Sequence, residues 1–133
     1  MSVETLPYLA LLLAVVLIYV PRVFVARGQA QQPEGYDNRH PRAQQVKLTG
    51  LAARARGAHE NSFEAFAPFA AGVLACKLAG VDAQTLALCS LSFVGVRTIY
   101  LFVYLNNLAL VRTAVWSLGF LITLALLVLP MLG

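Results

Sequence analysis

The stretch Thr113-Ala-Val-Trp-Ser-Leu-Gly-Phe-Leu-Ile-Thr-Leu-Ala-Leu-Leu-Val-Leu-Pro-Met-Leu-Gly133 decides the fold class. Its 21 residues include no charged side chain, and a helix needs about 20 predominantly apolar residues to cross a bilayer. The apolar residues are continuous rather than alternating, which favours a transmembrane helix over a strand of a β-barrel. This stretch therefore predicts an integral membrane protein.

The composition of the whole chain agrees with that prediction. Of the 133 residues, 59% are hydrophobic and 12% are charged, and the mean hydropathy is +0.73. Soluble domains are typically about 45–50% apolar and about 25% charged. Two cysteines are too few for a secreted disulfide scaffold, and the chain is too apolar to be disordered. The length accommodates a single domain over residues 1–133.

Three more apolar stretches precede the last one, at residues 5–21 (with apolar character to 26), 65–76 and 83–111. The stretch 65–76 is too short to span a bilayer unless it extends back through Asn61 and Glu64. We therefore expect an all-α bundle of four transmembrane helices, at about residues 4–26, 44–79, 82–105 and 109–131. The first stretch lacks the basic start and the cleavage site of a signal peptide, so it is expected to be a retained helix that Pro21 kinks or ends. Residues 29–36 should be irregular, and a helix should start near Pro41 and continue into the second crossing.

The basic residues are distributed unevenly along the chain. Seven of the ten fall in residues 22–56: Arg22, Arg27, Arg39, Arg42, Lys47, Arg54 and Arg56. Lysine and arginine are concentrated on the cytoplasmic side of membrane proteins. The sequence therefore predicts a cytoplasmic first loop with both termini outside.

Polar residues at membrane depth fall on helical stripes. An ionisable group there costs roughly 2.5–3.5 kcal/mol, so each one is a candidate for a functional site. At about 100° per residue, the polar residues of the second helix occupy a sector of about 80°. This stripe of the second helix consists of Arg54, Gly57, Asn61, Glu64 and Pro68. A similar stripe of the third helix consists of Cys89, Phe93, Arg97, Tyr100 and Tyr104. The fourth helix begins with Arg112, and Trp116 follows one turn later on the same face. Three helices thus direct polar groups toward one place at the cytoplasmic end.

The residues of these stripes also have purely structural interpretations. Glu64 and Arg97 suit a buried ion pair that would only lock two helices together, and Asn61 suits an interhelical hydrogen bond. Tyr100, Tyr104 and Trp116 suit the aromatic belt at a membrane surface, and Arg112 suits a cation that extends toward the lipid headgroups.

The histidines and cysteines give a weaker signal. His59 falls off the stripe, which favours a solvated or subunit-contact position. Cys76 and Cys89 are expected to be small apolar residues rather than a disulfide. Because two histidines and two cysteines occupy unrelated positions, no metal site is expected.

The polar groups suit a ligand that carries carboxylates, an ammonium and a thiol. Arginine binds a carboxylate through a planar two-pronged fork, and glutamate accepts an ammonium. An arginine at low dielectric also pushes a thiol toward its thiolate. Lowering a thiol pKa from about 8.5 to about 6.5 takes roughly 2.7 kcal/mol. Glutathione combines all of these groups in one molecule.

Three motifs resemble the MAPEG family, the membrane-associated proteins in eicosanoid and glutathione metabolism. The stretch Asp37-Asn38-Arg39-His40-Pro41-Arg42 resembles a motif of the bacterial branch. The stretch Arg54-Ala55-Arg56-Gly57-Ala58-His59-Glu60-Asn61-Ser62-Phe63-Glu64 resembles the signature of the second helix, in which arginines precede Asn-x-x-Glu. Arg97-Thr98-Ile99-Tyr100, then Tyr104, then Val111-Arg112 and Trp116 resemble the pattern of the third and fourth helices.

The resemblance implies a homotrimer in the inner (cytoplasmic) membrane, with glutathione bound between subunits as a co-substrate. It implies that Asn61 and Glu64 bind polar groups of glutathione, Glu64 its amine, and that Arg112 stabilises the thiolate. It also implies further contacts, which are Tyr100, Tyr104, Arg97 (to a carboxylate or to Glu64), His59 and, from the adjacent subunit, Arg27.

One position departs from the family pattern. Catalytic relatives carry an arginine four residues before the asparagine, where this chain has Gly57. A carboxylate clamp is therefore missing there, and Arg54, one turn earlier on the same face, is the residue that would reach in.

Three functions are compatible with these observations. The first is a microsomal-type glutathione transferase or peroxidase, in which the thiolate attacks lipophilic electrophiles. The second is a non-catalytic membrane protein of the same fold, whose polar stripes stabilise a trimer or bind lipid. The third is a small four-helix transporter with Glu64 as its essential carboxylate.

Overall fold

The chain forms an all-α membrane bundle in the computed structural model, which describes residues 2–132. Met1 and Gly133, the two ends of the predicted domain, lie outside the described residues. The helices are η1 (Val3–Thr5), α1 (Leu6–Ala30), α2 (Pro41–Val46), α3 (Gly50–Leu78), α4 (Ala83–Leu105), α5 (Ala109–Val128) and η2 (Leu129–Met131). The prediction of a four-helix membrane bundle is confirmed.

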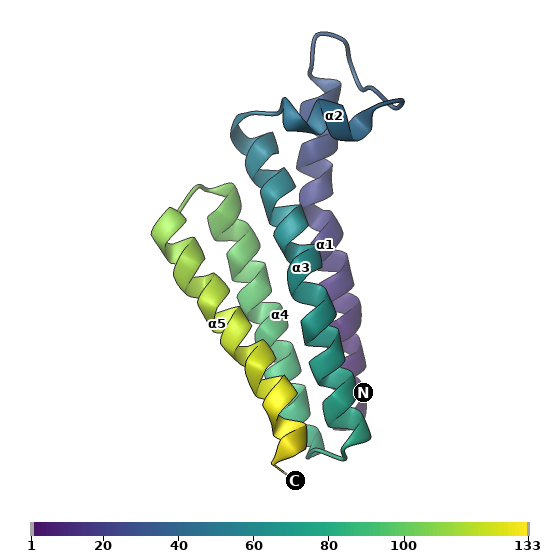
Figure 1. Cartoon of the computed structure of the whole chain (residues 1–133), viewed down its shortest axis with the longest axis vertical. Coiled ribbons are helices and arrows are strands. Elements are labelled where there is room, and N and C mark those ends of the chain that lie inside the picture. Colours follow the sequence, from purple (N-terminus) through teal and green to yellow (C-terminus); the bar gives the residue numbers. More distant parts are fainter. Residues whose placement is uncertain (1, 133) are drawn as a thin grey trace.

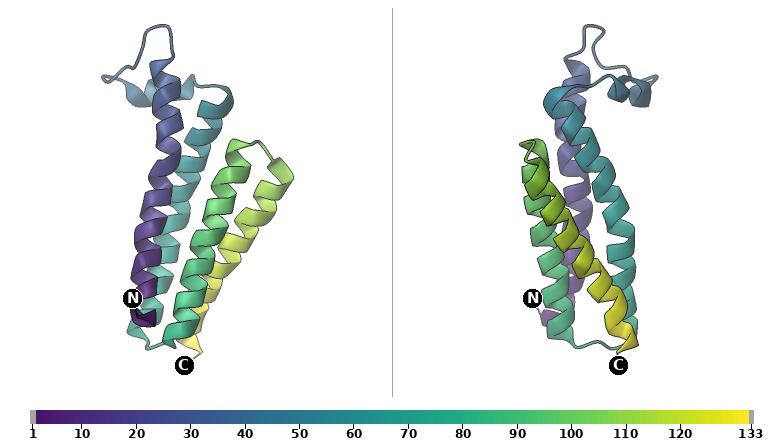
Figure 2. Two further views of the ribbon diagram at one scale, coloured as in Figure 1. Left: turned by 180° about the vertical axis from the view of Figure 1, so that it is seen from behind. Right: turned by 60° about the vertical axis from the view of Figure 1, so that its left-hand side comes forward.

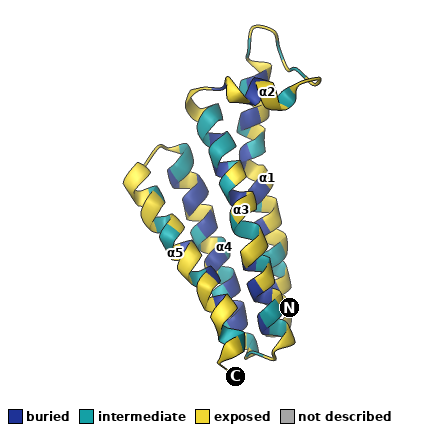
Figure 3. Cartoon of the chain, in the orientation of Figure 1, coloured by how far each residue is buried: buried dark blue, intermediate teal, exposed yellow. Residues whose placement is uncertain are grey.

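The four long helices run up and down side by side, and both termini lie at the same end (Figures 1 and 2). The other end, called the loop end below, carries residues 31–49 and the turn between α4 and α5. Within residues 2–132, three helical segments are long and apolar enough to span a membrane: Val3–Ala30, Ala83–Leu105 and Ala109–Met131. The fourth long helix, α3, has 29 residues and carries the charged part of the polar stripe. Buried side chains face the interior of the bundle, whereas much of α5 is exposed (Figure 3).

Pro21 neither ends α1 nor leaves the adjoining turn without support. The helix continues nine residues beyond it, to Ala30, so the expected end near residue 26 is too early. Proline has no N–H to donate and crowds the preceding turn, which weakens the hydrogen bonds of that turn. The ring nitrogen Nδ1 of His59, on α3, lies 2.6 Å from the carbonyl oxygen of Ile18. Since a carbonyl can only accept, this contact requires the proton on Nδ1, and a neighbouring helix thereby supports the turn next to the proline.

The prediction of one helix from about Pro41 into the second crossing is wrong. Pro41 does occupy the first turn of a helix, but that helix, α2, ends at Val46, and α3 starts at Gly50. Gly50 has φ +57°, a left-handed conformation that interrupts a right-handed helix and that glycine tolerates best. The break lets Leu48 turn inward, where it is 6% exposed and packs with Val25 and Ala55.

Three buried glutamines organise the loop end. Gln29, Gln44 and Gln45 are at most 8% exposed and bond to one another, with Gln29 Nε2 to Gln44 Oε1 at 3.0 Å and Gln45 Nε2 to Gln29 Oε1 at 3.3 Å. Gln44 also accepts from the N–H of Asp37 at 3.1 Å. Their polar groups are therefore satisfied within the protein, as burial requires.

Asp37 shapes the turn that leads into α2. Its Oδ1 accepts from the backbone N–H groups of His40, at 3.0 Å, and Arg39, at 2.8 Å. These hydrogen bonds hold the pKa of Asp37 below its usual range, because they favour the ionised carboxylate. Residues 37–42 thus build a turn and the start of a helix.

The cluster of buried side chains with the most members lies toward the terminal end of the bundle. Phe69 of α3 and Phe93 of α4 stack with their centroids 3.9 Å apart. The Cys76 thiol donates to the Leu126 carbonyl at 3.0 Å, and both cysteines are free, so no disulfide joins α3 and α4. The side chains packed around the two rings include Ala10, Ala14, Val73, Cys76, Leu86 and Leu126.

Close packing of α3 against α5 makes Gly72 intolerant of a side chain. A Cβ at position 72 would lie 2.8 Å from Leu126 Cβ and 3.3 Å from its carbonyl carbon. We expect Gly72→Ala to destabilise the protein by about 1–3 kcal/mol through overpacking, although alanine favours a helix. The measurement is thermal unfolding in detergent. Gly95→Ala in α4 is the matched control, because a Cβ there meets nothing within 4 Å and should leave the midpoint unchanged or higher.

Candidate functional site

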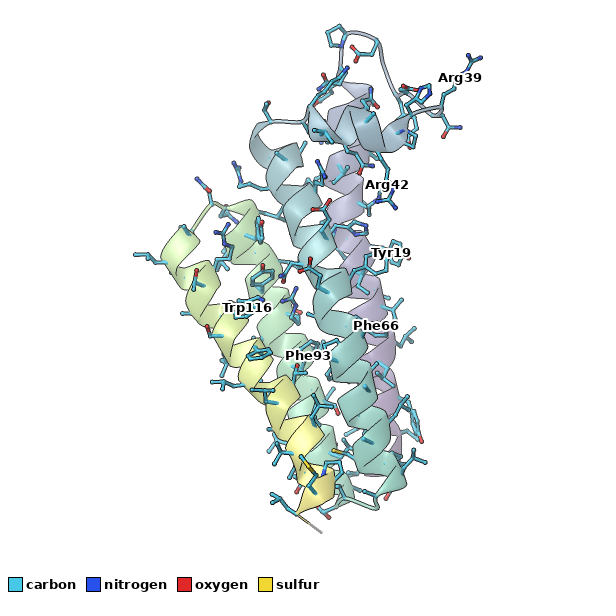
Figure 4. The ribbon with its side chains drawn as sticks, viewed as in Figure 1. Tyr19, Arg39, Arg42, Phe66, Phe93 and Trp116 are labelled. Carbon is cyan, nitrogen blue, oxygen red and sulfur yellow. The ribbon has the colours of Figure 1, made fainter. Side chains whose placement is uncertain are left out.

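The polar stripes meet at a cavity near the middle of the four long helices. The cavity has a volume of about 190 Å³ and opens between α3, α4 and α5. Figure 4 shows Trp116 on α5 and Phe93 on α4 beside this gap. The lining residues are Asn61, Glu64, Ala65, Pro68, Phe93, Arg97, Trp116, Gly119, Phe120 and Thr123. The cavity is therefore polar where Arg97 meets α3 and apolar beyond it.

Arg97 is the buried cation of the site. It is 5% exposed, and its guanidinium donates from Nη1 to Asn61 Oδ1 at 3.0 Å and from Nη2 to Ser62 Oγ at 3.1 Å. The guanidinium carbon also lies 4.1 Å from the centre of the Tyr100 ring. Within the described residues, Arg97 and Glu64 form no direct ion pair. Neutral groups and an aromatic face hold the charge instead.

Asn61 connects Arg97 to Glu64. While its oxygen accepts from Arg97, its Nδ2 donates to Glu64 Oε2 at 3.3 Å. Both ends of the amide are thus used, which defines its orientation. Glu64 is exposed toward the cavity, so its carboxylate remains open to a ligand.

Two tyrosines extend the site from Arg97 to Arg112. The Tyr100 and Tyr104 rings meet edge to face with centroids 5.5 Å apart, and the Arg112 guanidinium carbon lies 4.6 Å from the centre of Tyr104. Each cation–π contact is worth about 0.5–2 kcal/mol. Tyr100 is 3% exposed, which excludes the interpretation of this residue as a belt aromatic at the membrane surface.

Gly57 lets Tyr104 approach α3. A Cβ at position 57 would overlap the Tyr104 hydroxyl oxygen and lie 3.1 Å from Cζ. The space that a side chain at this position would enter is therefore filled from α4. Where the family pattern has an arginine side chain, the Tyr104 hydroxyl occupies the space beside Gly57.

Three predicted site residues lie elsewhere in the chain. Arg54 donates from Nε to the carbonyl of Leu105 at 2.9 Å, so it caps the C-terminus of α4 instead of reaching toward the cavity. His59 packs with Tyr19 and Phe63, centroids 5.9 and 5.1 Å away; Tyr19 lies on the other side of the bundle from Trp116 (Figure 4). Arg27 is exposed near the end of α1, beside Phe24 and Leu51.

The polar sequence patterns did not indicate Ser62, Phe120 and Thr123 as residues of this site. Ser62 contacts Arg97, but it lies one position beyond Asn61 and thus outside the sector of the polar stripe. Phe120 and Thr123 line the cavity, and both follow Trp116 at helical spacing, which would have indicated them. The Trp116 and Phe120 rings stack with centroids 5.4 Å apart and form the α5 wall.

The fold and the site together define a class, a polytopic α-helical membrane protein with a polar cluster at one end of an apolar cavity. Comparison with known families matches residues 5–132 to the MAPEG family, and the chain belongs to that family. Members of this family include glutathione-dependent enzymes. No curated protein and no solved structure matches the chain.

Proposed function

We propose that this protein is a glutathione-dependent membrane enzyme that activates the glutathione thiol for attack on lipophilic electrophiles. The observation that carries the proposal is a continuous series of side-chain contacts through Glu64, Asn61, Arg97, Tyr100, Tyr104 and Arg112. The first three residues of this series also line the cavity. The series offers an anion for an ammonium at one end and a cation for a thiolate or carboxylate at the other.

Each end of this series has a distinct chemical role. Glu64 accepts the ammonium of glutathione, and Asn61 holds the Glu64 carboxylate in place. Arg112 stabilises the thiolate, which needs no nucleophile from the protein. The tyrosines separate the two ends and line the site. Electrophiles enter from the bilayer along Phe93, Trp116 and Phe120.

The reaction is conjugation or reduction by the bound thiolate. In conjugation, the sulfur lone pair forms the new carbon–sulfur bond while a leaving group departs or a conjugated double bond accepts the electrons. Proximity of the two reactants and lowering of the thiol pKa supply the rate enhancement. Transferase and peroxidase activities both fit this site.

The proposed active assembly is a homotrimer with a site between subunits. Much of α5 is exposed, and the cavity is open, so a neighbouring copy has room to complete it. Arg27 is exposed and can contact an adjacent subunit, whereas His59 is half-buried against α1 and would do so only along its accessible edge. The unequal charge distribution supports a cytoplasmic loop end and external termini. The resemblance of residues 37–42 to a bacterial motif of the family supports a bacterial inner membrane.

A non-catalytic role is the second candidate. Two observations favour it, since Arg54 is bonded to the end of α4 and position 57 has no cation. In that case the polar series stabilises the bundle or its assembly.

Glutathione titration of the detergent-purified protein tests the proposal. We expect saturable binding together with the ultraviolet difference absorbance of a thiolate. An analogue in which a methyl group replaces the thiol should bind without that absorbance. No binding at millimolar glutathione, in a protein that is still folded and oligomeric, would favour the non-catalytic role.

A further inference from the structure

Ser62 binds Arg97 from a position outside the lining of the ligand cavity. It is 6% exposed, and its hydroxyl donates to the Ala58 carbonyl at 2.8 Å. Because this bond uses the only hydroxyl proton, the oxygen is left as an acceptor, and it receives Arg97 Nη2 at 3.1 Å. The side chain thus presents a fixed acceptor to a buried cation.

The guanidinium of Arg97 is oriented by two consecutive residues of α3. Nη1 bonds to Asn61 and Nη2 to Ser62, and the Tyr100 ring lies 4.1 Å from the guanidinium carbon. Two hydrogen bonds from a planar group define its plane as well as its position. Loss of either acceptor leaves a buried, charged donor without a partner, which is costly.

The orientation of Arg97 is transmitted to Glu64. With Asn61 Oδ1 occupied by Arg97, the amide turns Nδ2 toward Glu64, whose carboxylate lines the cavity. A guanidinium released from Ser62 would gain most by turning to this same carboxylate, since it is the nearest anion along the series. A direct pair between Arg97 and Glu64 would then withdraw the carboxylate from a ligand.

We propose that Ser62 is a positioning residue, which holds Arg97 on Asn61 and thereby keeps Glu64 free for the ammonium of the ligand. The proposal rests on the proposed function where it concerns the ligand. Ser62 acts only on the ammonium end of the site, because Arg112 lies at the other end of the tyrosine pair.

Ser90 provides a matched control. It is also buried, on α4, and its hydroxyl donates to the carbonyl four residues earlier, that of Leu86, at 2.7 Å. Ser62 and Ser90 are therefore both buried inside a helix, and each donates its hydroxyl to the carbonyl four residues earlier. They differ because Ser62 also contacts Arg97. Replacing either by alanine removes the same atoms.

The experiment compares glutathione affinity and the pKa of the bound thiol in Ser62→Ala, Ser62→Thr and Ser90→Ala. We expect Ser62→Ala to raise the Kd of glutathione about tenfold, as loss of a hydrogen bond to a charged group would, with the thiol pKa unchanged. Under turnover, KM should rise while kcat at saturating glutathione stays constant. Ser62→Thr keeps the hydroxyl and should restore affinity, and Ser90→Ala should resemble the wild type. Equal effects of the two alanine variants, or a parallel shift in thiol pKa, would overturn the proposal.

A ligand-free measurement separates this proposal from the proposed function. If the wild type binds no glutathione, the proposed function fails, and Ser62 is then tested by unfolding alone. Double-mutant cycles with Arg97→Met should show coupling to Ser62→Ala and none to Ser90→Ala. Absence of coupling between Ser62 and Arg97 would refute the positioning role.

Discussion

Arg112→Ala is expected to abolish the thiolate signal of bound glutathione while the protein remains folded. If Arg112 lowers the thiol pKa from about 8.5 to about 6.5, the thiolate fraction at pH 7 falls from about three quarters to about 3% when the cation is removed, a loss of about 25-fold. The direction follows from charge, since a nearby cation favours the anionic thiolate. The measurement is the ultraviolet difference absorbance of the complex as a function of pH.

Two controls make that result specific to position 112. Arg42→Ala removes an exposed arginine from α2 and should leave the thiol pKa unchanged. Arg112→Lys retains the charge but not the planar guanidinium over Tyr104, so it should keep part of the shift. An unaltered thiolate signal in a folded Arg112→Ala protein would assign thiol activation to another group.

Gly57→Ala is expected to damage the site although alanine is the better helix former by about 1 kcal/mol. The new Cβ would overlap the Tyr104 hydroxyl, so the ring must leave its place beside Tyr100 and below Arg112. We expect a loss of glutathione affinity of tenfold or more, because both ring contacts are broken together. The measurement is the titration used for the wild type.

A double-mutant cycle that combines Gly57→Ala with Tyr104→Phe tests whether the overlap with the hydroxyl causes this loss. Removal of the hydroxyl oxygen removes the overlapping atom, so Gly57→Ala should cost much less in the Tyr104→Phe background. Installing the arginine of the family pattern, Gly57→Arg, should also fail to improve affinity while Tyr104 occupies the space. An increase in affinity in Gly57→Arg would instead mean that Gly57 is only a missing clamp.

Several features of the site were predictable from local patterns. The stripe spacing in α3 and α4 placed Asn61, Glu64 and Arg97 on faces that do line one cavity. Tyr100 and Tyr104 follow Arg97 by three and seven residues, and the structure brings them into contact. Helical periodicity is sufficient for such assignments, because a helix fixes the direction of each side chain relative to its neighbours.

The partners of these groups were not predictable in the same way. The sequence suggested an ion pair between Arg97 and Glu64, whereas in the structure Arg97 donates hydrogen bonds to Asn61 and Ser62. The sequence also suggested that Arg54 binds a ligand carboxylate in place of the arginine absent at position 57, whereas Arg54 donates to the last carbonyl of α4. Each choice depends on distances of a few ångströms between helices that are far apart in sequence.

Four membrane helices could be predicted from the sequence, because apolar length and the period of 3.6 residues are properties of each segment alone. The separation of α2 from α3 at the left-handed Gly50, and the position of the Tyr104 hydroxyl beside Gly57, could be known only from the folded bundle. Those outcomes depend on how Leu48 packs against α1 and how closely α4 approaches α3. Packing between helices is a property of the whole bundle, and it sets which polar groups meet.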